Sequence, residues 1–256
     1  LVPRLQKLAM ENKAAAYNYP QGVLSQLFRD IAAGKPGLIT HVGLKTFVDP
    51  ALEGGMLNDK AREAGPLVER IEIGGETRLL YKALPIDVAV IRATYADTQG
   101  NCTFQREGVS AETLAIAQAA KNSGGRVIVQ VEDVVEYGAL DTRLVRLPGI
   151  YVDAIVAAAP ENHMQTFGTG YNPAYCGEVR VPVSSLKPLA LDQRKVVARR
   201  AAMELVPNAI TNLGIGMPEG VAAVAAEEGL QGMVLTTEAG TIGGIPAGGK
   251  DFGVTI

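Results

Sequence analysis

Hydrophobic positions in this sequence fall into two patterns that alternate along the chain. After YPQG, apolar residues recur at helical spacing and predict a helix over roughly Val23–Ala33. The next stretch, GLITHVG, predicts a buried strand. The stretch LVERIEIGGETRLLYKAL holds two alternating runs around Gly74-Gly75 and predicts a hairpin. Helices and strands in this order indicate an α/β fold.

The same patterns continue through the middle of the chain. DVAVIRATY predicts a strand, and SAETLAIAQAAKNSGG predicts a helix with Ser110 as its N-cap and Gly124 as its stop. Two further strands are predicted by RVIVQVEDVV and YVDAIVAAA. Because these β-branched runs do not alternate with polar residues, we expect parallel strands covered on both faces.

A loop-rich stretch separates two α/β segments. From about Met164 to Lys187 Gly, Pro, Tyr and Asn dominate, which predicts a linker. Beyond it LDQRKVVARRAAMEL predicts a helix and NAITNLGIG a strand. PEGVAAVAAEEG predicts a second helix, with Pro218 in its first turn and Gly229 at its end, and GMVLTTE predicts another strand. The terminal DFGVTI also reads as a strand.

This order predicts two similar domains. We expect residues 1–187 to belong to one α/β domain, with a linker from about 164, and residues 188–256 to begin a second one. The sequence starts and stops within this predicted two-domain arrangement. We therefore expect it to be a segment of a longer protein.

Composition excludes several functional classes. The chain of 256 residues has a net charge of −3 with scattered Lys and Arg, so no nucleic-acid partner is expected. No apolar stretch reaches the ~18 residues of a membrane span. Cys102 and Cys176 form no CxxC and indicate reduced thiols in a cytoplasm. His41 and His163 lack metal-ligand spacing, so we expect them at the surface or hydrogen-bonded.

A glycine turn in NLGIGMPEG has two possible roles. Gly214 and Gly216 end a predicted strand, and Pro218 opens a helix, so backbone N–H groups there would face an anion. The dinucleotide fingerprint G-x-G-x-x-G is not matched, because the third glycine, Gly220, comes one position late. A phosphate contact and a plain strand-to-helix turn both remain open.

A second glycine-rich stretch superficially matches a phosphate-binding loop. Gly244 and Gly249-Lys250 have the P-loop spacing, but Asp251 stands where a magnesium-binding Ser or Thr is required. The following KDFGVTI is strand-like, whereas a P-loop opens a helix. We therefore expect a flexible loop with a solvated Lys250.

Glu238 is the candidate for chemistry. It follows a predicted parallel strand, at the end where α/β proteins place ligands. On position alone it would be a surface residue, but Gly240, Gly243 and Gly244 leave room for a substrate to approach the carboxylate. A carboxylate is ionised at pH 7 and needs no partner base. By attacking a thioester it would form an acyl anhydride, which keeps the acyl group activated.

Five motifs bear a family resemblance. They are AYNYPQG, TFVDP, QAAKNSGGRVIVQVE, VPNAITNLGIGMPEGVA and TTEAGTIGGIPAGG. In this order they resemble the family I CoA-transferases of the short-chain acyl-CoA, or propionate, type. The resemblance implies an open, mostly parallel-sheet fold of the NagB/RpiA-like kind and a protein longer than this chain.

The resemblance also implies site roles. Glu238 would form an acyl-glutamyl anhydride and then a glutamyl-CoA thioester, and Gln21 would help to bind the oxyanion. From its position alone, Gln21 is a helix-terminal residue that caps its own turn. Many relatives have S-E-N-G where this chain has T-E-A-G, which fits the propionate-type branch. A glycine of the oxyanion site, in a later GGF-containing region, would follow residue 256.

Four glycines match binding positions of the family. Gly214 and Gly216 match a turn that lines the CoA site, and Gly243 and Gly244 match the loop beside the nucleophile.

The predicted activity is ping-pong transfer of CoA between short-chain acyl-CoA and free carboxylic acids. No cofactor or metal is needed, because CoA enters as a substrate, and the family implies a homo-oligomer. Two alternatives stay open: an acyl-CoA hydrolase on the same fold, in which water resolves the glutamyl intermediate, and a non-catalytic CoA-binding subunit.

Overall fold

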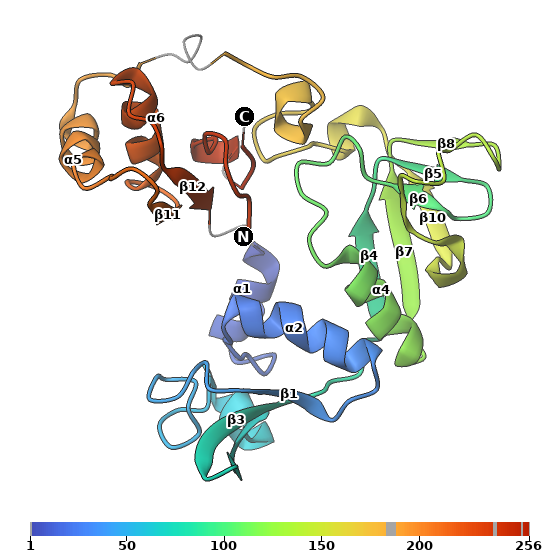
Figure 1. The fold of residues 1–256 in the computed structure, drawn as a ribbon. Helices are drawn as coiled ribbons and strands as arrows, with labels where there is room; N and C mark the ends of the chain where they lie inside the picture. Colours follow the sequence, from blue (N-terminus) through green and yellow to red (C-terminus); the bar gives the residue numbers. More distant parts are fainter. Residues whose placement is uncertain (1, 183–187, 238–239, 252, 256) are drawn as a thin grey trace. The chain divides into compact units, whose positions relative to one another are not determined.

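The chain contains both helices and strands, as the sequence predicts (Figure 1). The computed structural model describes residues 2–182, 188–237, 240–251 and 253–255. The α-helices are α1 (Pro3–Met10), α2 (Gln21–Ala32), α3 (Asp59–Ala64), α4 (Thr113–Asn122), α5 (Gln193–Ala202) and α6 (Glu219–Glu227). The first strands are β1 (Gly37–Thr40), β2 (Val68–Ile73), β3 (Glu76–Lys82), β4 (Val88–Arg92), β5 (Tyr95–Asp97) and β6 (Cys102–Thr103). The later strands are β7 (Arg126–Val131), β8 (Asp133–Val135), β9 (Val145–Leu147), β10 (Ala154–Ala157), β11 (Ile210–Leu213) and β12 (Val234–Thr237).

Contacts within the chain divide it into two compact units. The first comprises Leu1–Ile91, Glu112–Ile128 and Tyr151–Ala154, and the second comprises Arg92–Ala111, Val129–Ile150 and Ile155–Ile256. A three-stranded sheet has the order β10-β7-β4, and the residues of each of these strands are divided between the units. The expected domain boundary near residue 188 stays a prediction.

The first unit contains the predicted hairpin. β2 and β3 pair antiparallel with Ile73 opposite Glu76. Gly74 and Gly75 join them at φ 61° and 78°. Two successive positive φ angles are what a two-residue type I′ turn requires, and glycine adopts them without steric cost. The hairpin prediction is therefore confirmed.

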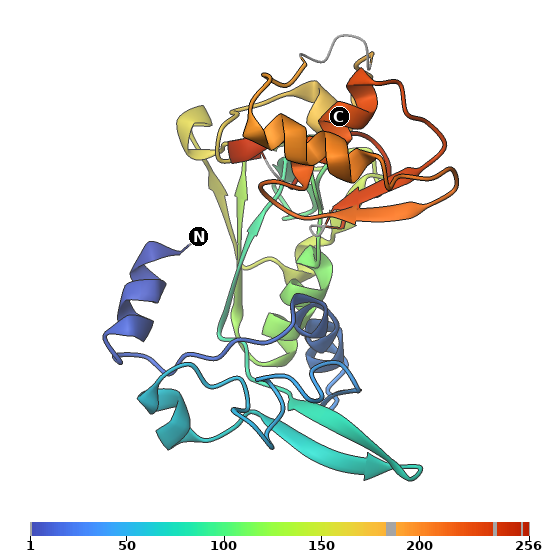
Figure 2. The same cartoon turned by 90° about the vertical axis from the view of Figure 1, so that its left-hand side faces the viewer.

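One face of α2 forms the core of the first unit. Val23, Leu27 and Ile31, spaced one turn apart, are buried against Leu79 and Tyr81 of β3. On another side α2 lies beside α4, as Figures 1 and 2 both show. The four-residue spacing places all three side chains on one stripe of the helix, which explains why the helix packs against the sheet.

Three of the expected burial patterns are wrong. β10 was expected to be covered on both faces, but none of its residues is buried, and Val156 is 48% exposed. Ile39 of β1 is 46% exposed, so β1 is not a buried strand. In β4, Ala89 and Ile91 are buried while Val88 and Val90 are exposed. The strand therefore alternates, because no described helix covers the face that carries Val88 and Val90.

The expected start of α4 is also wrong. The helix begins at Thr113 with Glu112 as its N-cap, not Ser110. Ala111 has φ 40°, a left-handed conformation that separates Ser110 from the helix. The Ser110 hydroxyl accepts a hydrogen bond from Arg146 instead. The predicted stop is confirmed, since Gly124 follows the helix at φ 79°.

The second unit contains a four-stranded sheet in the order β8-β5-β6-β9. β5 pairs parallel with β8, whereas β5–β6 and β6–β9 are antiparallel. Asp97 closes the β5–β6 turn, where its buried carboxylate accepts hydrogen bonds from the Gln99 N–H, the Asn101 N–H and the Asn101 side-chain amide. Burial alone would raise the pKa of Asp97, but these hydrogen bonds outweigh it and lower the pKa.

We expect Asp97→Ala to destabilise the protein by about 2 kcal/mol, because it leaves buried donors without an acceptor. The folded-state pKa of Asp97 lies below its ordinary value of 3.8. Its contribution is therefore fully present above that ordinary value and is lost as the pH falls through the lower folded value. Thermal unfolding from pH 7 down to pH 3 measures both effects.

Asp141→Ala is the control for this prediction. Asp141 pairs with Arg143 on the surface, and its removal is expected to leave the unfolding temperature almost unchanged. Equal effects of the two substitutions would contradict the role given to the Asp97 turn.

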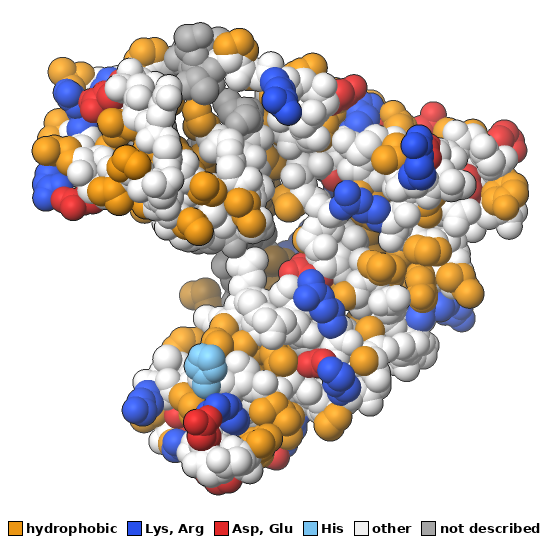
Figure 3. All heavy atoms as spheres, in the orientation of Figure 1, with side chains coloured by type: hydrophobic (Ala, Val, Ile, Leu, Met, Phe, Trp, Pro, Cys, Tyr) orange, Lys and Arg blue, Asp and Glu red, His pale blue; other side chains and the backbone are white. Residues whose placement is uncertain are grey.

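The last part of the second unit forms the predicted strand–helix–strand arrangement. β11 and β12 pair in parallel, and α5 and α6 pack against them through Ala198, Leu213, Val224 and Leu235. Gly229 follows α6 at φ 68°, which confirms the predicted helix stop. Figure 3 shows hydrophobic side chains mixed with charged ones on the surface over α5 and α6.

The segment after β12 differs from its prediction. Gly249–Asp251 forms a 3₁₀ helix, and Thr255 makes only an isolated antiparallel bridge with Pro246. Val254 is buried and lies close to Gly108, so it packs against the second unit without belonging to a regular strand. The terminal strand prediction is therefore wrong within the described residues.

Candidate active site

β12 ends at Thr237, and the described chain resumes at Gly240. The predicted nucleophile, Glu238, and its neighbour Ala239 lie outside the described residues. Their flanks are closely tied. The Thr237 N–H donates to the Thr241 carbonyl at 3.1 Å, the Gly240 N–H donates to the Thr237 carbonyl at 3.0 Å, and the two threonine hydroxyls are 2.6 Å apart. These contacts fix both ends of the two-residue link at the place where parallel sheets present ligands.

Backbone conformation explains the glycines of this loop. Gly240, Gly243 and Gly244 have φ angles of 96°, 79° and 70°. A Cβ at Gly240 or Gly243 would meet no atom within 4 Å. The positive φ angles explain why these positions are glycine. The space beside Gly240 and Gly243 is open. The Gly243 N–H donates to the Leu235 carbonyl at 2.8 Å, so the loop folds back along β12.

The other glycine turn lies at the same edge of the sheet. Leu213 of β11 is the parallel neighbour of Thr237 of β12. Since adjacent strands are about 5 Å apart, the turn that begins at Gly214 starts beside the turn that follows Thr237. Gly216 has φ 91°, and open space lies where its Cβ would be. The start of the predicted glycine turn and Thr237, the residue before the predicted nucleophile, are thus neighbours in the sheet.

Two polar side chains that the sequence analysis did not single out contact the glycine segments at this edge of the sheet. Arg194 of α5 donates to the Gly216 carbonyl at 3.1 Å and lies 3.7 Å from Glu219 at the start of α6. Glu219 in turn accepts from the Gly249 N–H at 3.5 Å, so it links α6 to the end of the glycine loop. Its other carboxylate oxygen is buried without a hydrogen-bond partner in the described part of the chain. Only the helical position of Arg194 is readable from the sequence, not its contact with a turn 22 residues away.

A cavity adjoins the glycine turn. It has a volume of about 460 Å³, and its lining includes Arg194, Met217, Glu219, Pro246 and Gly248. The cavity thus lies between the start of α6 and the end of the glycine loop. Lys250 belongs to a 3₁₀ helix and is exposed, which agrees with the rejection of a P-loop.

Gln21 is the first residue of α2, in the first unit. Pro20 is the N-cap, and the helix has no side-chain cap hydrogen bond. The alternative in which Gln21 caps its own turn is therefore wrong. The side chain is exposed, and it forms no hydrogen bond within the ranges that the structure describes.

The second unit also buries an ionisable cluster. Glu107 lies 2.7 Å from Arg92 and 3.8 Å from His163. Burial raises the pKa of Glu107 and lowers that of His163, whose ring also contacts the Gln130 amide at 3.1 Å. His163 is thus hydrogen-bonded, as expected of it. The Glu107–Arg92 pair lies within the second unit.

Other candidate sites find no support. In the described residues, no group of three or more His, Cys, Asp and Glu side chains is placed to hold a metal ion. Cys102 and Cys176 are free thiols, and burial raises the pKa of Cys102 to about 12. No helix in the described ranges is long and apolar enough to span a membrane.

Comparison with known proteins decides the family. The family model for coenzyme A transferase matches residues 2–158. The chain belongs to the coenzyme A transferase family. The motif-based resemblance is thereby confirmed.

Full-length relatives of this coenzyme A transferase chain extend the match. A caffeate CoA-transferase of Acetobacterium woodii is 49% identical and covers 97% of this chain. The acetate CoA-transferase YdiF of Escherichia coli (strain K12) is 42% identical over 99% of it. This chain covers 48% of each of these two relatives, about half their length.

A solved structure confirms the fold. The acyl-CoA transferase YdiF of E. coli O157:H7, solved as a thioester complex with CoA, has a TM-score of 0.85 at 40% identity. The alignment covers 98% of this chain and 49% of that one. The open-sheet α/β CoA-transferase fold predicted from the sequence is confirmed.

Proposed function

We propose that the whole protein transfers coenzyme A between short-chain acyl-CoA and free carboxylic acids, of the propionate and acetate type. The transfer runs through a covalent glutamyl-CoA thioester at Glu238. The observation that supports the proposal is at the end of β12. There Thr237 and Thr241, which flank Glu238 in the sequence, are hydrogen-bonded to each other, and Thr237 is the neighbour of Leu213, which precedes the Gly214–Gly216 turn. A relative with 40% identity forms a thioester complex with CoA, which supports the same chemistry here.

The chemistry has balanced steps. The Glu238 carboxylate attacks the thioester carbonyl, the CoA thiolate leaves, and an acyl-glutamyl anhydride forms. The thiolate then attacks the glutamyl carbonyl and releases the acyl group as a free carboxylate. The second acid attacks the glutamyl-CoA thioester, and the same steps in reverse make the new acyl-CoA. Every intermediate is an activated acyl group, so ping-pong kinetics follow.

The other predicted residues have roles in this proposal. Gln21 donates its amide N–H to the oxyanion of the tetrahedral intermediate. Gly214 and Gly216 line the CoA site, where open space lies beside Gly216. Gly243 and Gly244 let the substrate approach Glu238.

The proposal also sets the molecular context. CoA is a substrate, so no resident cofactor or metal takes part. The two free thiols support a cytoplasmic protein, and the family resemblance supports a homo-oligomer.

Acceptor dependence tests the proposal. With propionyl-CoA alone, we expect the protein to consume about one equivalent per active site, because the glutamyl-CoA thioester waits for an acid. Added acetate is expected to restore continuous turnover with acetyl-CoA as the product. The measurement is acyl-CoA by liquid chromatography over time. Continuous loss of propionyl-CoA without acetate would indicate the hydrolase alternative.

A further inference from the structure

Glu219 lies between the two glycine segments of the candidate site. It is the first residue of α6, and its side chain is only 14% exposed. One carboxylate oxygen, Oε1, lies 3.7 Å from the Nη2 atom of Arg194 and accepts from the Gly249 N–H at 3.5 Å. The same Arg194 nitrogen donates to the Gly216 carbonyl at 3.1 Å. One nitrogen and one oxygen thus connect the turn that contains Gly216 to the end of the glycine loop, residues 240–251.

The backbone of the glycine loop approaches this carboxylate closely at Gly248. A Cβ at Gly248 would lie 3.4 Å from the Cδ atom of Glu219 and 3.6 Å from both of its carboxylate oxygens. The φ angle of Gly248 is not positive, so the backbone conformation does not require glycine there. The glycine instead allows the close approach, because a larger side chain would extend towards the carboxylate.

A purely stabilising role does not explain the burial of Glu219. Its other oxygen, Oε2, is buried and has no hydrogen-bond partner in the described part of the chain. A buried carboxylate oxygen without a donor lowers stability rather than raising it. An acid at the start of a helix is favourable, but an exposed acid would have the same effect without this cost. Such a departure from good packing is expected where a side chain serves function.

The glycine loop connects Glu219 to the end of β12. Near the start of the loop, the Gly243 N–H donates to the Leu235 carbonyl of β12 at 2.8 Å. At its end, Gly249 contacts Glu219. Only residues 244–248 separate these two contacts, so a shift of the loop end is passed over a short distance to the segment beside β12.

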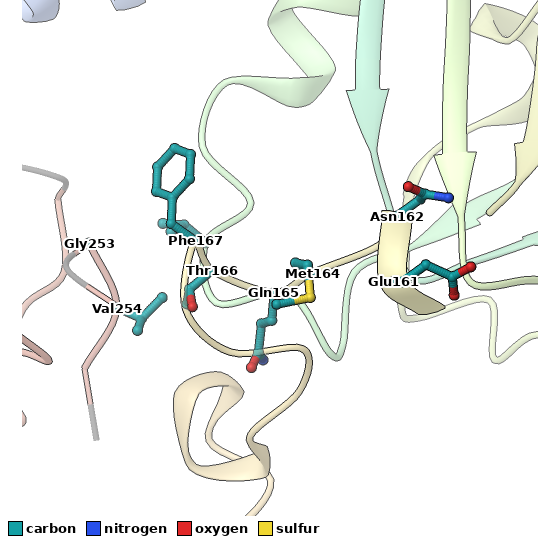
Figure 4. A pocket seen from close by; sticks show the side chains of 9 residues that line it. Glu161, Asn162, Met164, Gln165, Thr166, Phe167, Gly253 and Val254 are labelled. Atoms are coloured by element: carbon teal, nitrogen blue, oxygen red, sulfur yellow. The ribbon is translucent and has the colours of Figure 1, made fainter. Parts of the chain in front are cut away.

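The end of the loop has a second attachment on another segment. Asp251 accepts hydrogen bonds from the Thr166 hydroxyl and, at 3.2 Å, from the Tyr175 hydroxyl. Figure 4 shows Thr166 and Val254 on separate segments, which line one cavity. Because these contacts remain when Glu219 is replaced, we expect the loop end to shift rather than to detach.

We propose that Glu219 is a positioning residue for CoA transfer. Together with Arg194 it holds the end of the glycine loop at the Gly216 turn, and it acts through the loop and not on the reacting atoms. This inference rests on the proposed function and adds a residue to it. A misplacement of about 1 Å costs a positioned reaction up to about 10²-fold in rate, so kcat depends on this contact more than substrate affinity does.

The test measures three substitutions of Glu219 in the full-length enzyme. The fraction of enzyme that forms glutamyl-CoA with propionyl-CoA alone gives the number of active sites, and kcat with acetate as acceptor is expressed per active site. Glu219→Ala and the shorter Glu219→Asp are each expected to lower this kcat about 30-fold and to change KM for propionyl-CoA less than about threefold. Glu219→Gln keeps the length and an accepting oxygen, so its kcat is expected to stay within about threefold of the wild-type value.

Hydrogen exchange reports on the same contact without any substrate. Glu219→Ala and Glu219→Asp are expected to speed the exchange of backbone N–H groups in the peptide that contains Gly249, because the loop end loses an attachment. Glu219→Gln is expected to exchange as the wild type does. Mass spectrometry of the digested protein makes this measurement.

Glu228→Ala is the matched control. Glu228 is the C-cap of α6 and lies 2.6 Å from Arg199 of α5, so it is also an acid paired with an arginine between the same two helices. It lies at the opposite end of α6 from Glu219. We expect its removal to change neither kcat per active site nor the exchange of the loop peptide.

Four outcomes overturn the inference in distinguishable ways. If Glu219→Ala lowers the number of active sites but not kcat per site, the residue only stabilises the fold. If Glu219→Gln is as slow as Glu219→Ala, the negative charge matters and not the contact with the loop. If loop exchange is the same in all variants, Glu219 does not hold the loop. If exchange changes as predicted but the wild-type enzyme transfers no CoA, the contact stands, while the proposed function fails and the role in transfer fails with it.

Discussion

Replacing Glu238 by alanine is expected to lower transferase turnover by about 10⁴-fold or more, because no other group would carry CoA between the two acids. Glu238→Asp is expected to lose about 10²-fold, since the shorter side chain withdraws the carboxylate from attack distance. Exchange of label between propionyl-CoA and free propionate measures both variants with a single acid. The affinity for CoA is expected to stay within about threefold, because the remaining contacts are untouched.

A matched acid controls for charge in this region. Glu204 follows α5 and is an exposed acid paired with Arg200, so Glu204→Gln keeps its shape and removes one charge outside the candidate site. We expect this variant to retain most of its exchange activity. An alanine variant of Glu238 with wild-type exchange would contradict the nucleophile assignment.

Gln21→Ala is expected to lower kcat by about 10²–10³ with little change in CoA affinity. The reason is that its amide would meet an oxygen whose negative charge develops only in the transition state. The substitution is expected to leave the stability of α2 unchanged, because Pro20 is the N-cap and the helix has no side-chain cap hydrogen bond. Steady-state kinetics measure kcat and KM separately, and thermal unfolding measures the stability of the variant.

Gln26→Ala provides the comparison for this variant. Gln26 is an exposed glutamine on the same helix, and we expect its loss to change kcat by less than about twofold. A Gln21→Ala enzyme with normal kcat would show that this side chain has no part in the chemistry.

Much of the fold could be predicted because its signals are local. The Gly74-Gly75 hairpin, the glycine stops at Gly124 and Gly229, and the β11–α6–β12 unit each depend on a short stretch of residues. In these places spacing and backbone preference act together, and the structure agrees with the prediction.

Predictions that depended on distant contacts failed. Ser110 is a good N-cap by type, but the left-handed Ala111 and the contact with Arg146 draw it away from α4. The β-branched β4 was expected to be covered on both faces, yet Val90 is 75% exposed. Tertiary packing decides whether both faces of a strand are covered, and the sequence of the strand alone does not determine this.

Some features of the candidate site are visible in the sequence, and others appear only in the folded chain. A glutamate after a strand and its glycines are visible in the sequence, as is the turn at Gly214–Gly216. The hydroxyl pair of Thr237 and Thr241 and the contact of Arg194 with Gly216 are not, because each needs the folded loop. In the sequence, a threonine at positions 237 and 241 is a signal from which this hydroxyl pair could have been suspected.

The central claim is that CoA becomes covalently attached to Glu238, and peptide mapping tests it most directly. The enzyme is incubated with propionyl-CoA alone, the thioester is reduced with borohydride, and the digest is analysed by mass spectrometry. We predict a single modified glutamyl side chain in the TTEAG peptide, with its carboxylate converted to an alcohol, and no modification in Glu238→Ala. A modified residue elsewhere, or an unmodified TTEAG peptide in an enzyme that transfers CoA, would contradict the account.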